Sequence, residues 1–250
     1  ITMLKIKKEQ EPDLLECLLD MGQLLLESGA EISRVEDTLC RIARAYGAIR
    51  ADAFVITSIV SITIEFTESD LITENRRIYS SSGTDFYRIE KLNELSRKIC
   101  RAPEPLNEFR KSIDEITSQE KPFSIILTGS ILAAGGFAVF FGGSFNDGIA
   151  ASFFAWGICM LQKYLGRTQI NPAASNILIS LIIGLCVGIL CRLITSLHMD
   201  KILIGDIMLL IPGLAMTNAV RNIIVGNTIS GVVRLTECFI WALSLAGGFM

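Results

Sequence analysis

Residues 121–141 read KPFSIILTGSILAAGGFAVFF, and at this stretch the chain changes from a sequence suited to water to one suited to lipid. The chain has 23 Lys or Arg and 26 Asp or Glu residues, but only six of the former and four of the latter lie after residue 121. About 20 apolar residues in a helix match the thickness of the bilayer hydrocarbon. The stretch therefore predicts that a membrane half (residues 122–250) begins here and follows a water-soluble half (residues 1–121).

Apolar segments continue to the end of the sequence, separated by Gly, Pro, Asn and isolated charges. One such segment could be a buried helix of a soluble protein, but five in tandem indicate a membrane domain. The fourth is short and is interrupted by Pro212-Gly213. The expected transmembrane helices are residues 123–141, 146–165, 174–197, 202–219 and 229–250.

The water-soluble half has patterns of both helices and strands. Leu14–Ser28 has helical spacing, with Gly29 placed to end it, and Ser33 with Glu36 has the spacing of a capping box that opens a second helix. From Phe54 to Phe66 apolar residues alternate with period two, which predicts one strand with Phe54 and Ile56 on its buried face.

A turn at Glu68-Ser69-Asp70 leads to a second predicted strand at Ile72–Tyr79, and two further helices are predicted at Asp85–Arg101 and Glu104–Glu120. The order ααββαα predicts an α+β domain in which helices cover one face of an antiparallel sheet. The predicted fold class is thus a membrane α-helical protein with an N-terminal cytoplasmic α+β domain, residues 1–121.

Basic residues indicate the orientation of the membrane half. Ile1–Gln10 is charged and lacks the apolar region of a signal peptide, which predicts a cytoplasmic soluble half in a multi-pass protein of the cell membrane. The C-terminus is then outside, and Lys201 lies in an outer loop. The positive-inside rule agrees, because five basic residues fall at inner boundaries: Lys121, Lys163, Arg167, Arg221 and Arg234.

Polar residues within the apolar segments suggest a path for a substrate. A charge at mid-bilayer costs at least about 2.5–3.5 kcal/mol, so Asp206 and Glu237 need a partner or a use. Two structural interpretations stay open: Arg234 pairs with Glu237 on one helix face, and Asp206 caps a helix near the interface. The functional interpretation makes them part of a path at the Pro212-Gly213 break, since transporters hold substrates at broken helices. The predicted path comprises Asp206, Pro212, Gly213, Asn218, Arg221, Asn222, Arg234 and Glu237.

Several classes of function lack support. The soluble half contains no His, and the chain has neither a Walker A motif nor GxGxxG, so we expect no catalytic set and no nucleotide cofactor. The seven cysteines show no metal-ligand spacing, and the single His198 is interpreted as a surface residue, so no metal site is expected. No basic stripe suggests nucleic acid.

Two groups of residues resemble the threonine/serine exporter family. The first is Gly29-Ala30-Glu31-Ile32-Ser33-Arg34-Val35-Glu36-Asp37-Thr38, near the start of the chain. The second is the series Pro212-Gly213, Asn218-Ala219, Gly226, Gly231, Arg234 and Glu237. The resemblance implies a cytoplasmic domain followed by membrane helices. Full-length members carry ten, so a chain with five is similar to the large subunit of the split form, which works with a small membrane protein that supplies the other five. Members are described as exporters of threonine and serine, and some split pairs as exporters of succinate.

The leading hypothesis is therefore a subunit of a secondary exporter for a small hydrophilic metabolite, driven by protons because nothing binds nucleotide. A substrate carboxylate would bind Arg221 or Arg234, and Glu237 or Asp206 would carry the proton. Asn222 and Asn227 stand where the family often has Asp, so the substrate is not transferred from the resemblance.

Alternatives remain open at this point. The Glu31 to Asp37 cluster could be a solvated helix face, or it could belong to a membrane-anchored enzyme or sensor with its active site in the cytoplasmic domain. A scaffold for a membrane partner, and a homo-oligomer, are further alternatives.

Overall fold

The computed structural model describes residue 6 and residues 8–67, 70–78, 84–119, 122–166 and 172–249. The chain forms two compact units. The first unit comprises Ile1–Glu120 with Leu214–Leu235, and the second comprises Lys121–Gly213 with Thr236–Met250. The predicted turn residues Glu68 and Ser69, the strand end Tyr79, and the boundary residues Lys121 and Arg167 lie outside the described residues.

In its described residues the first unit contains a three-stranded sheet and seven helical elements, the last of which it shares with the second unit. In chain order its elements are η1 (Lys8–Gln10), α1 (Glu11–Glu27), α2 (Ile32–Ala45), β1 (Arg50–Ile56), β2 (Ile59–Glu65), β3 (Ile72–Arg77), α3 (Phe86–Arg101), α4 (Leu106–Ser118), α9 (Gly213–Ile224) and the start of α10 (Thr228–Phe249). The strands are antiparallel in the order β1-β2-β3. The predicted α+β composition of this part of the chain is confirmed.

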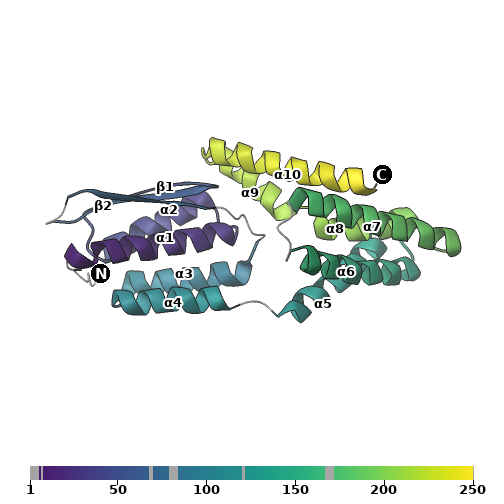
Figure 1. Ribbon diagram of the computed structural model, residues 1–250, viewed down its shortest axis with the longest axis horizontal. Helices are drawn as coiled ribbons and strands as arrows, with labels where there is room; N and C mark the ends of the chain where they lie inside the picture. Colours follow the sequence, from purple (N-terminus) through teal and green to yellow (C-terminus); the bar gives the residue numbers. More distant parts are fainter. Residues whose placement is uncertain are drawn as a thin grey trace. The chain divides into compact units, whose positions relative to one another are not determined.

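Two layers of helices cover one face of the sheet (Figure 1). Helices α1 and α2 pack on the strands, and α3 and α4 pack on α1 and α2. Buried aliphatic side chains such as Leu18, Ile42 and Ile62 fill the space between these layers. Farther from the sheet, the rings of Tyr46 and Phe109 stack with centroids 6.2 Å apart, and the Tyr46 hydroxyl donates to the Glu104 carbonyl at 2.8 Å. Burial of apolar area is the main driving force for such a core.

A glycine ends α1, as the sequence predicts. Gly29 has a φ of +82°, a conformation that costs other residues about 1–2 kcal/mol. Its N–H donates to the Leu26 carbonyl, and the Ala30 N–H donates to the Leu25 carbonyl, both at 2.9 Å. This is a Schellman motif, which satisfies the last carbonyls of the helix and turns the chain sharply toward α2.

The predicted capping box at the start of α2 is wrong. The N-cap is Glu31, whose backbone is extended, and its side chain makes no cap hydrogen bond. Ser33 lies inside the helix, and its hydroxyl donates to Glu31 Oε1 at 2.9 Å. The capping box does not form because the Schellman motif at Gly29 places the N-cap of α2 at Glu31, two residues before Ser33.

The single strand predicted over Phe54–Phe66 is in fact two strands joined at Thr57-Ser58, where Ile56 pairs with Ile59. The order is therefore ααβββαα before the membrane segments. Because the two-residue turn reverses the chain, the alternation changes parity: Val55 is buried in β1, whereas Phe54 is 62% exposed. Within β2 the prediction is confirmed, since Val60, Ile62 and Ile64 are buried.

The second unit is entirely helical in its described residues. It contains α5 (Phe123–Phe140), α6 (Phe145–Leu165), α7 (Pro172–Leu193), α8 (Met199–Leu210) and the remainder of α10. By length and composition α5, α7 and α10 can each cross a membrane. Helices α8 and α9 qualify together as one broken span or as a re-entrant loop; counted as one span, they bring the candidate spans among the described residues from three to four. The protein is therefore a membrane protein. The break between α8 and α9 falls at Ile211-Pro212, one residue before the predicted Pro212-Gly213, because Gly213 already belongs to α9.

Helices α5, α6 and α8 are packed through very small residues. A Cβ added to Gly205 of α8 would lie 2.6 Å from the Ala134 carbonyl oxygen of α5. A Cβ on Gly135 of α5 would lie 3.0 Å from the Gly148 carbonyl oxygen of α6. The Ser152 hydroxyl of α6 donates to the Ile131 carbonyl of α5 at 3.0 Å. Such contacts let main chains approach where lipid provides no hydrophobic drive between helices.

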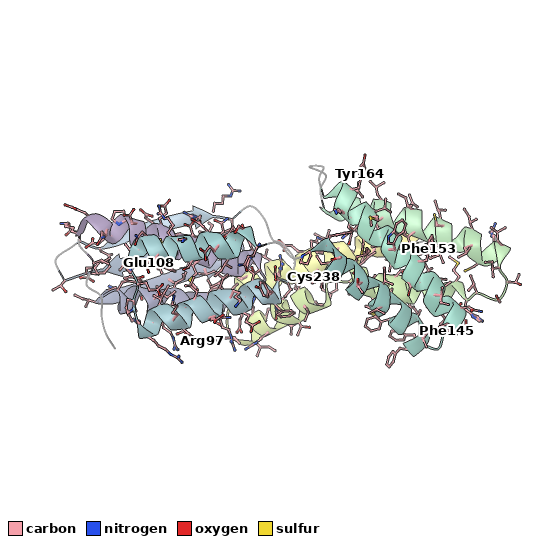
Figure 2. All side chains as sticks on the ribbon, turned by 90° about the horizontal axis from the view of Figure 1, so that it is seen from below. Arg97, Glu108, Phe145, Phe153, Tyr164 and Cys238 are labelled. Atoms are coloured by element: carbon pink, nitrogen blue, oxygen red, sulfur yellow. The ribbon has the colours of Figure 1, made fainter. Side chains whose placement is uncertain are left out.

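The outward side chains of α6 differ from those of the α+β elements. Phe145, Phe153 and Tyr164 are exposed on α6, whereas Arg97 and Glu108 mark the charged surface of α3 and α4 (Figure 2). Exposed aromatic residues in such number suit lipid or another membrane helix.

Candidate functional site

A cavity in the first unit brings the two groups of motif residues together. Gly29 and Ala30, from the turn between α1 and α2, line it together with Asn218 and Asn222 of α9 and Arg234 of α10. The remaining lining residues are Leu26, Ile32, Thr57, Ile78, Thr84 and Ala215. The cavity, with a volume of about 60 Å³, therefore offers amide, hydroxyl and guanidinium groups within an otherwise apolar lining; it is smaller than a typical small-molecule site and would have to widen to hold a metabolite.

An ion pair connects the same two groups of motif residues. Glu31 Oε2 lies 3.0 Å from Arg221 Nη2 and 3.5 Å from Arg34 Nε. The Glu31 side chain is 11% exposed, whereas that of Arg221 is 54% exposed. Glu31 lies between the lining residues Ala30 and Ile32, and Arg221 directly precedes the lining residue Asn222. The pair thus belongs to the immediate surroundings of the cavity.

Gly231 allows α10 to approach α9. A Cβ at Gly231 would lie 2.8 Å from the Ala219 carbonyl oxygen, so a larger residue would push the helices apart. Arg234 follows one turn later and reaches the cavity. On the facing helix Asn222 is 7% exposed, and its Oδ1 has no hydrogen-bond partner among the described residues. A buried acceptor of this kind favours a bound donor.

The other motif residues of α2 have local roles. Glu36 Oε1 accepts from the Val55 N–H at 2.9 Å and so attaches α2 to β1, and burial raises the pKa of Glu36 above its usual value. Asp37 pairs with Arg41 on the exposed face at 2.8 Å. The solvated-face interpretation therefore fits Asp37, whereas Glu31 faces α9.

The rest of the predicted path lies in the second unit, which contains Asp206, Pro212, Gly213 and Glu237. Asp206 is fully buried, and neither of its carboxylate oxygens has a hydrogen-bond partner among the described residues. It directly follows Gly205, whose main chain contacts α5. The suggestion that Asp206 caps a helix is wrong, because the N-cap of α8 is His198.

Sequence analysis missed three residues with structural importance. Thr57 and Thr84 line the cavity. The sequence marks the turn at Thr57 through the next residue, Ser58, because this polar residue interrupts the alternation of apolar residues where the hairpin reverses direction. The third is Asp147, which is fully buried at the start of α6.

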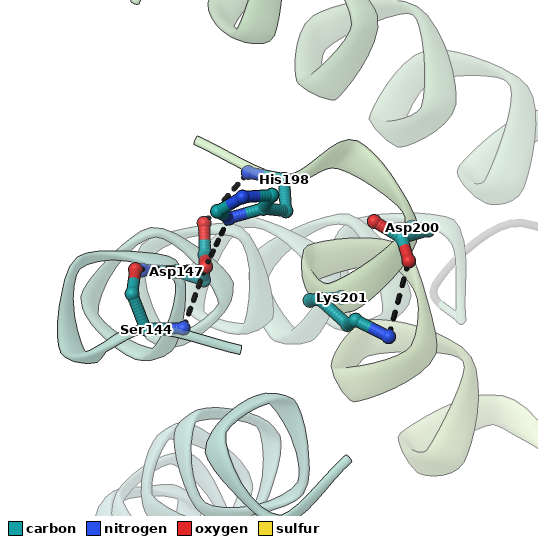
Figure 3. Close-up of polar contacts among 5 residues, drawn as sticks. All are labelled: Ser144, Asp147, His198, Asp200 and Lys201. Atoms are coloured by element: carbon teal, nitrogen blue, oxygen red, sulfur yellow. Dashed lines mark hydrogen bonds and ion pairs between the residues drawn. The ribbon is translucent and has the colours of Figure 1, made fainter. Parts of the chain in front are cut away.

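Asp147 joins the loop before α6 to the start of α8 (Figure 3). Its Oδ2 accepts from the Ser144 N–H at 2.7 Å and from the Ser144 hydroxyl at 2.8 Å. Its Oδ1 accepts from the His198 N–H at 2.8 Å, and His198 Nδ1 lies 3.0 Å from Oδ2. The His198 side chain is 62% exposed, in agreement with its interpretation as a surface residue. No group of three or more potential metal ligands occurs in the part of the chain that the structure describes.

Comparison with known proteins identifies the class. The model of the family described as "Putative threonine/serine exporter" matches residues 16–250. The chain belongs to the threonine/serine exporter family, a family of membrane transporters.

Three relatives illustrate the range of similarity. The chain is 20% identical to the "Threonine/serine exporter" of Corynebacterium glutamicum, over 91% of this chain and 48% of that protein. It is 20% identical to the "Probable threonine/serine exporter" of Mycobacterium tuberculosis, over 94% of this chain and 45% of that protein. It is 24% identical to the "Probable succinate transporter subunit YjjP" of Klebsiella aerogenes, over 88% of this chain and 83% of that protein.

The chain spans about half the length of the threonine/serine exporters it matches and most of the length of the succinate transporter subunit. No solved structure matches.

The Asp147 cluster gives a prediction of stability. Asp147→Asn replaces a carboxylate that accepts three hydrogen bonds, and a bond to a charged group is worth about 1.5–3 kcal/mol. We expect a lower melting temperature for the purified full chain in detergent. The matched control is Asp200→Asn, which removes an exposed partner of Lys201 and should leave melting unchanged. Equal melting of the two variants would contradict this role of Asp147.

Proposed function

We propose that this protein is a subunit of a secondary exporter for a small hydrophilic metabolite that carries a carboxylate, either an amino acid of the threonine/serine type or a dicarboxylate such as succinate. Family membership supports the transport class, and the names of the relatives supply the two substrate types. The observation that carries the proposal is the cavity between the Gly29 turn, α9 and α10, with Arg234 in its lining and Arg221 beside it. Guanidinium groups bind carboxylates with paired, charge-assisted hydrogen bonds.

We assign the remaining path residues to the same route. In this proposal Asn218 and Asn222 hydrogen-bond the substrate, and the path passes Pro212 and Gly213 at the break between α8 and α9. Gly29 and Glu31 with Ser33 shape the cytoplasmic approach, and Arg34, Glu36 and Asp37 support α2. Asp206 or Glu237 carries the coupling proton.

A small membrane partner completes the transporter in this proposal. The succinate transporter relative is named a subunit, and the threonine/serine exporters are about twice as long as their match to this chain. Exposed apolar side chains such as Leu132 and Ile229 provide surface for lipid and for that partner.

The test is export from loaded cells. Cells that express the chain together with a neighbouring gene for a small membrane protein should export threonine, serine or succinate faster than cells with either gene alone. The chain alone should not export, because half of a transporter leaves polar groups of the path without their partners. Full transport by the chain alone in liposomes would refute the requirement for a partner.

We further propose that α6 also crosses the membrane, so that residues 122–250 form five spans behind a cytoplasmic domain of residues 1–121. Lys163 near the end of α6 then lies inside, and Asp147 at its start lies outside. Single cysteines at Asn146 and Asp200, on a cysteine-free background, should react with an impermeant thiol reagent from outside intact cells. Reaction from the cytoplasmic side only would reverse the topology.

Proton coupling predicts a specific phenotype for Asp206. Because neither carboxylate oxygen has a hydrogen-bond partner among the described residues, Asp206→Asn breaks no hydrogen bond and removes a buried charge. We expect normal yield, an unchanged or higher melting temperature, and loss of proton-driven export. The exposed residue of the same helix, in Asp200→Asn, is the matched control and should export normally. Wild-type export by Asp206→Asn at several pH values would remove Asp206 from the mechanism.

A further inference from the structure

The Glu31–Arg221 ion pair places an internal carboxylate on a guanidinium that the proposed function reserves for a substrate. Glu31 Oε2 and Arg221 Nη2 are 3.0 Å apart. The two residues come from the two separate motif regions, one before the sheet and one in α9. A substrate carboxylate that binds Arg221 competes with Glu31, because two carboxylates at one guanidinium repel each other.

The main chain at Glu31 is held firmly. The Schellman motif at Gly29 fixes the turn before it. The Glu31 carbonyl accepts from the N–H groups of Arg34 at 3.1 Å and Val35 at 3.0 Å, which are the first bonds of α2. Release of Arg221 therefore requires only a rotation of the Glu31 side chain and no unfolding of the helix.

The side-chain contact itself is easily exchanged. Glu31 Oε2 is buried, yet it has no hydrogen bond of good geometry, and its two ion pairs are to Arg221 and, at 3.5 Å, to Arg34. Electrostatic attraction holds Glu31 and Arg221 together without a hydrogen bond of good geometry. The Arg221 side chain is 54% exposed, so other parts of the chain do not enclose its guanidinium. A second carboxylate can compete for such a pair at little cost.

A second observation, in the lining of the adjacent cavity, favours the binding of a ligand there. Asn222, the neighbour of Arg221, is 7% exposed, lines the cavity and has an Oδ1 without a hydrogen-bond partner among the described residues. A buried acceptor costs free energy until a donor reaches it. A hydroxyl or ammonium group of a bound metabolite supplies such a donor, while the carboxylate of the same molecule takes Arg221 from Glu31.

We infer that Glu31 is a latch: it occupies Arg221 in the substrate-free protein, and the substrate carboxylate binds Arg221 beside the cavity by displacing it. This inference rests on the proposed function. It assigns to Glu31 a further role, which is to set the substrate concentration that export requires. If the latch is closed in about nine molecules of ten, its removal increases the apparent affinity about tenfold.

The experiment compares four forms of the full chain, each purified with its membrane partner and reconstituted in liposomes. The forms are the wild type, Glu31→Gln, Arg221→Gln and the double variant. The probes are labelled L-threonine, L-serine and succinate, and the concentration dependence of transport gives KM and kcat. The Gln at position 31 keeps the oxygen that accepts from the Ser33 hydroxyl, so the turn is retained.

We expect Glu31→Gln to lower KM for the transported probe by about tenfold, if the latch is closed in nine molecules of ten as above. Arg221→Gln should raise KM, and the double variant should behave like Arg221→Gln, since the gain requires a free guanidinium. Glu31→Asp, which shortens the side chain, should give an intermediate KM. Two controls remove one charge from exposed pairs of the same domain and should leave KM unchanged: Glu94→Gln, the partner of Lys91, and Arg50→Gln, the partner of Asp52.

The outcomes separate the latch from the exporter proposal. An unchanged or raised KM in Glu31→Gln, with a raised KM in Arg221→Gln, overturns the latch and keeps the exporter. A lowered KM that persists in the double variant also overturns the latch, because the gain then does not pass through Arg221. Absence of transport of all three probes by the wild-type pair overturns the exporter proposal, and the latch with it.

Discussion

A charged group removed from water needs a counter-charge, a set of hydrogen bonds or a chemical use, and this constraint organises both units of the protein. Asp147 meets it with hydrogen bonds: its carboxylate accepts from Ser144 and His198 and so ties together two loops. Glu31 meets it with counter-charges, Arg221 and Arg34. Asp206 has no hydrogen-bond partner for either carboxylate oxygen within the described residues, and for this reason we propose Asp206 as a carrier of the coupling proton.

The division of the chain gives these groups their context. Residues 214–235 belong to the same compact unit as the α+β domain, although their sequence is that of a membrane segment. Residues of the Gly29–Thr38 motif and polar residues of α9 therefore line one cavity and share one ion pair. The α+β domain therefore contributes directly to the cavity, because the turn between α1 and α2 forms part of the cavity lining.

The sequence predicted the helices and most strand residues because their signals are local. Length and apolarity place α5, α7 and α10, and the glycine at position 29 places the end of α1. The hairpin at Thr57-Ser58 escaped prediction because a period-two pattern continues through a two-residue turn while the buried face changes parity. The pairing of Glu31 with Arg221 was also out of reach, because no local pattern indicates contact between residues so far apart in the chain.

The glycine contacts among α5, α6 and α8 have a mechanical consequence. Gly135, Gly148 and Gly205 bring main-chain atoms of neighbouring helices into contact, and carbonyl oxygens fill the space that a single methyl group would need. Helices in such close contact, through main chain and through small side chains such as Ser152 and Val139, have little room to slide or rotate past one another. We therefore expect these three helices to move together as one block. Any rearrangement that carries a solute across the bilayer must take place at the borders of that block, and Asp206, next to Gly205, travels with it.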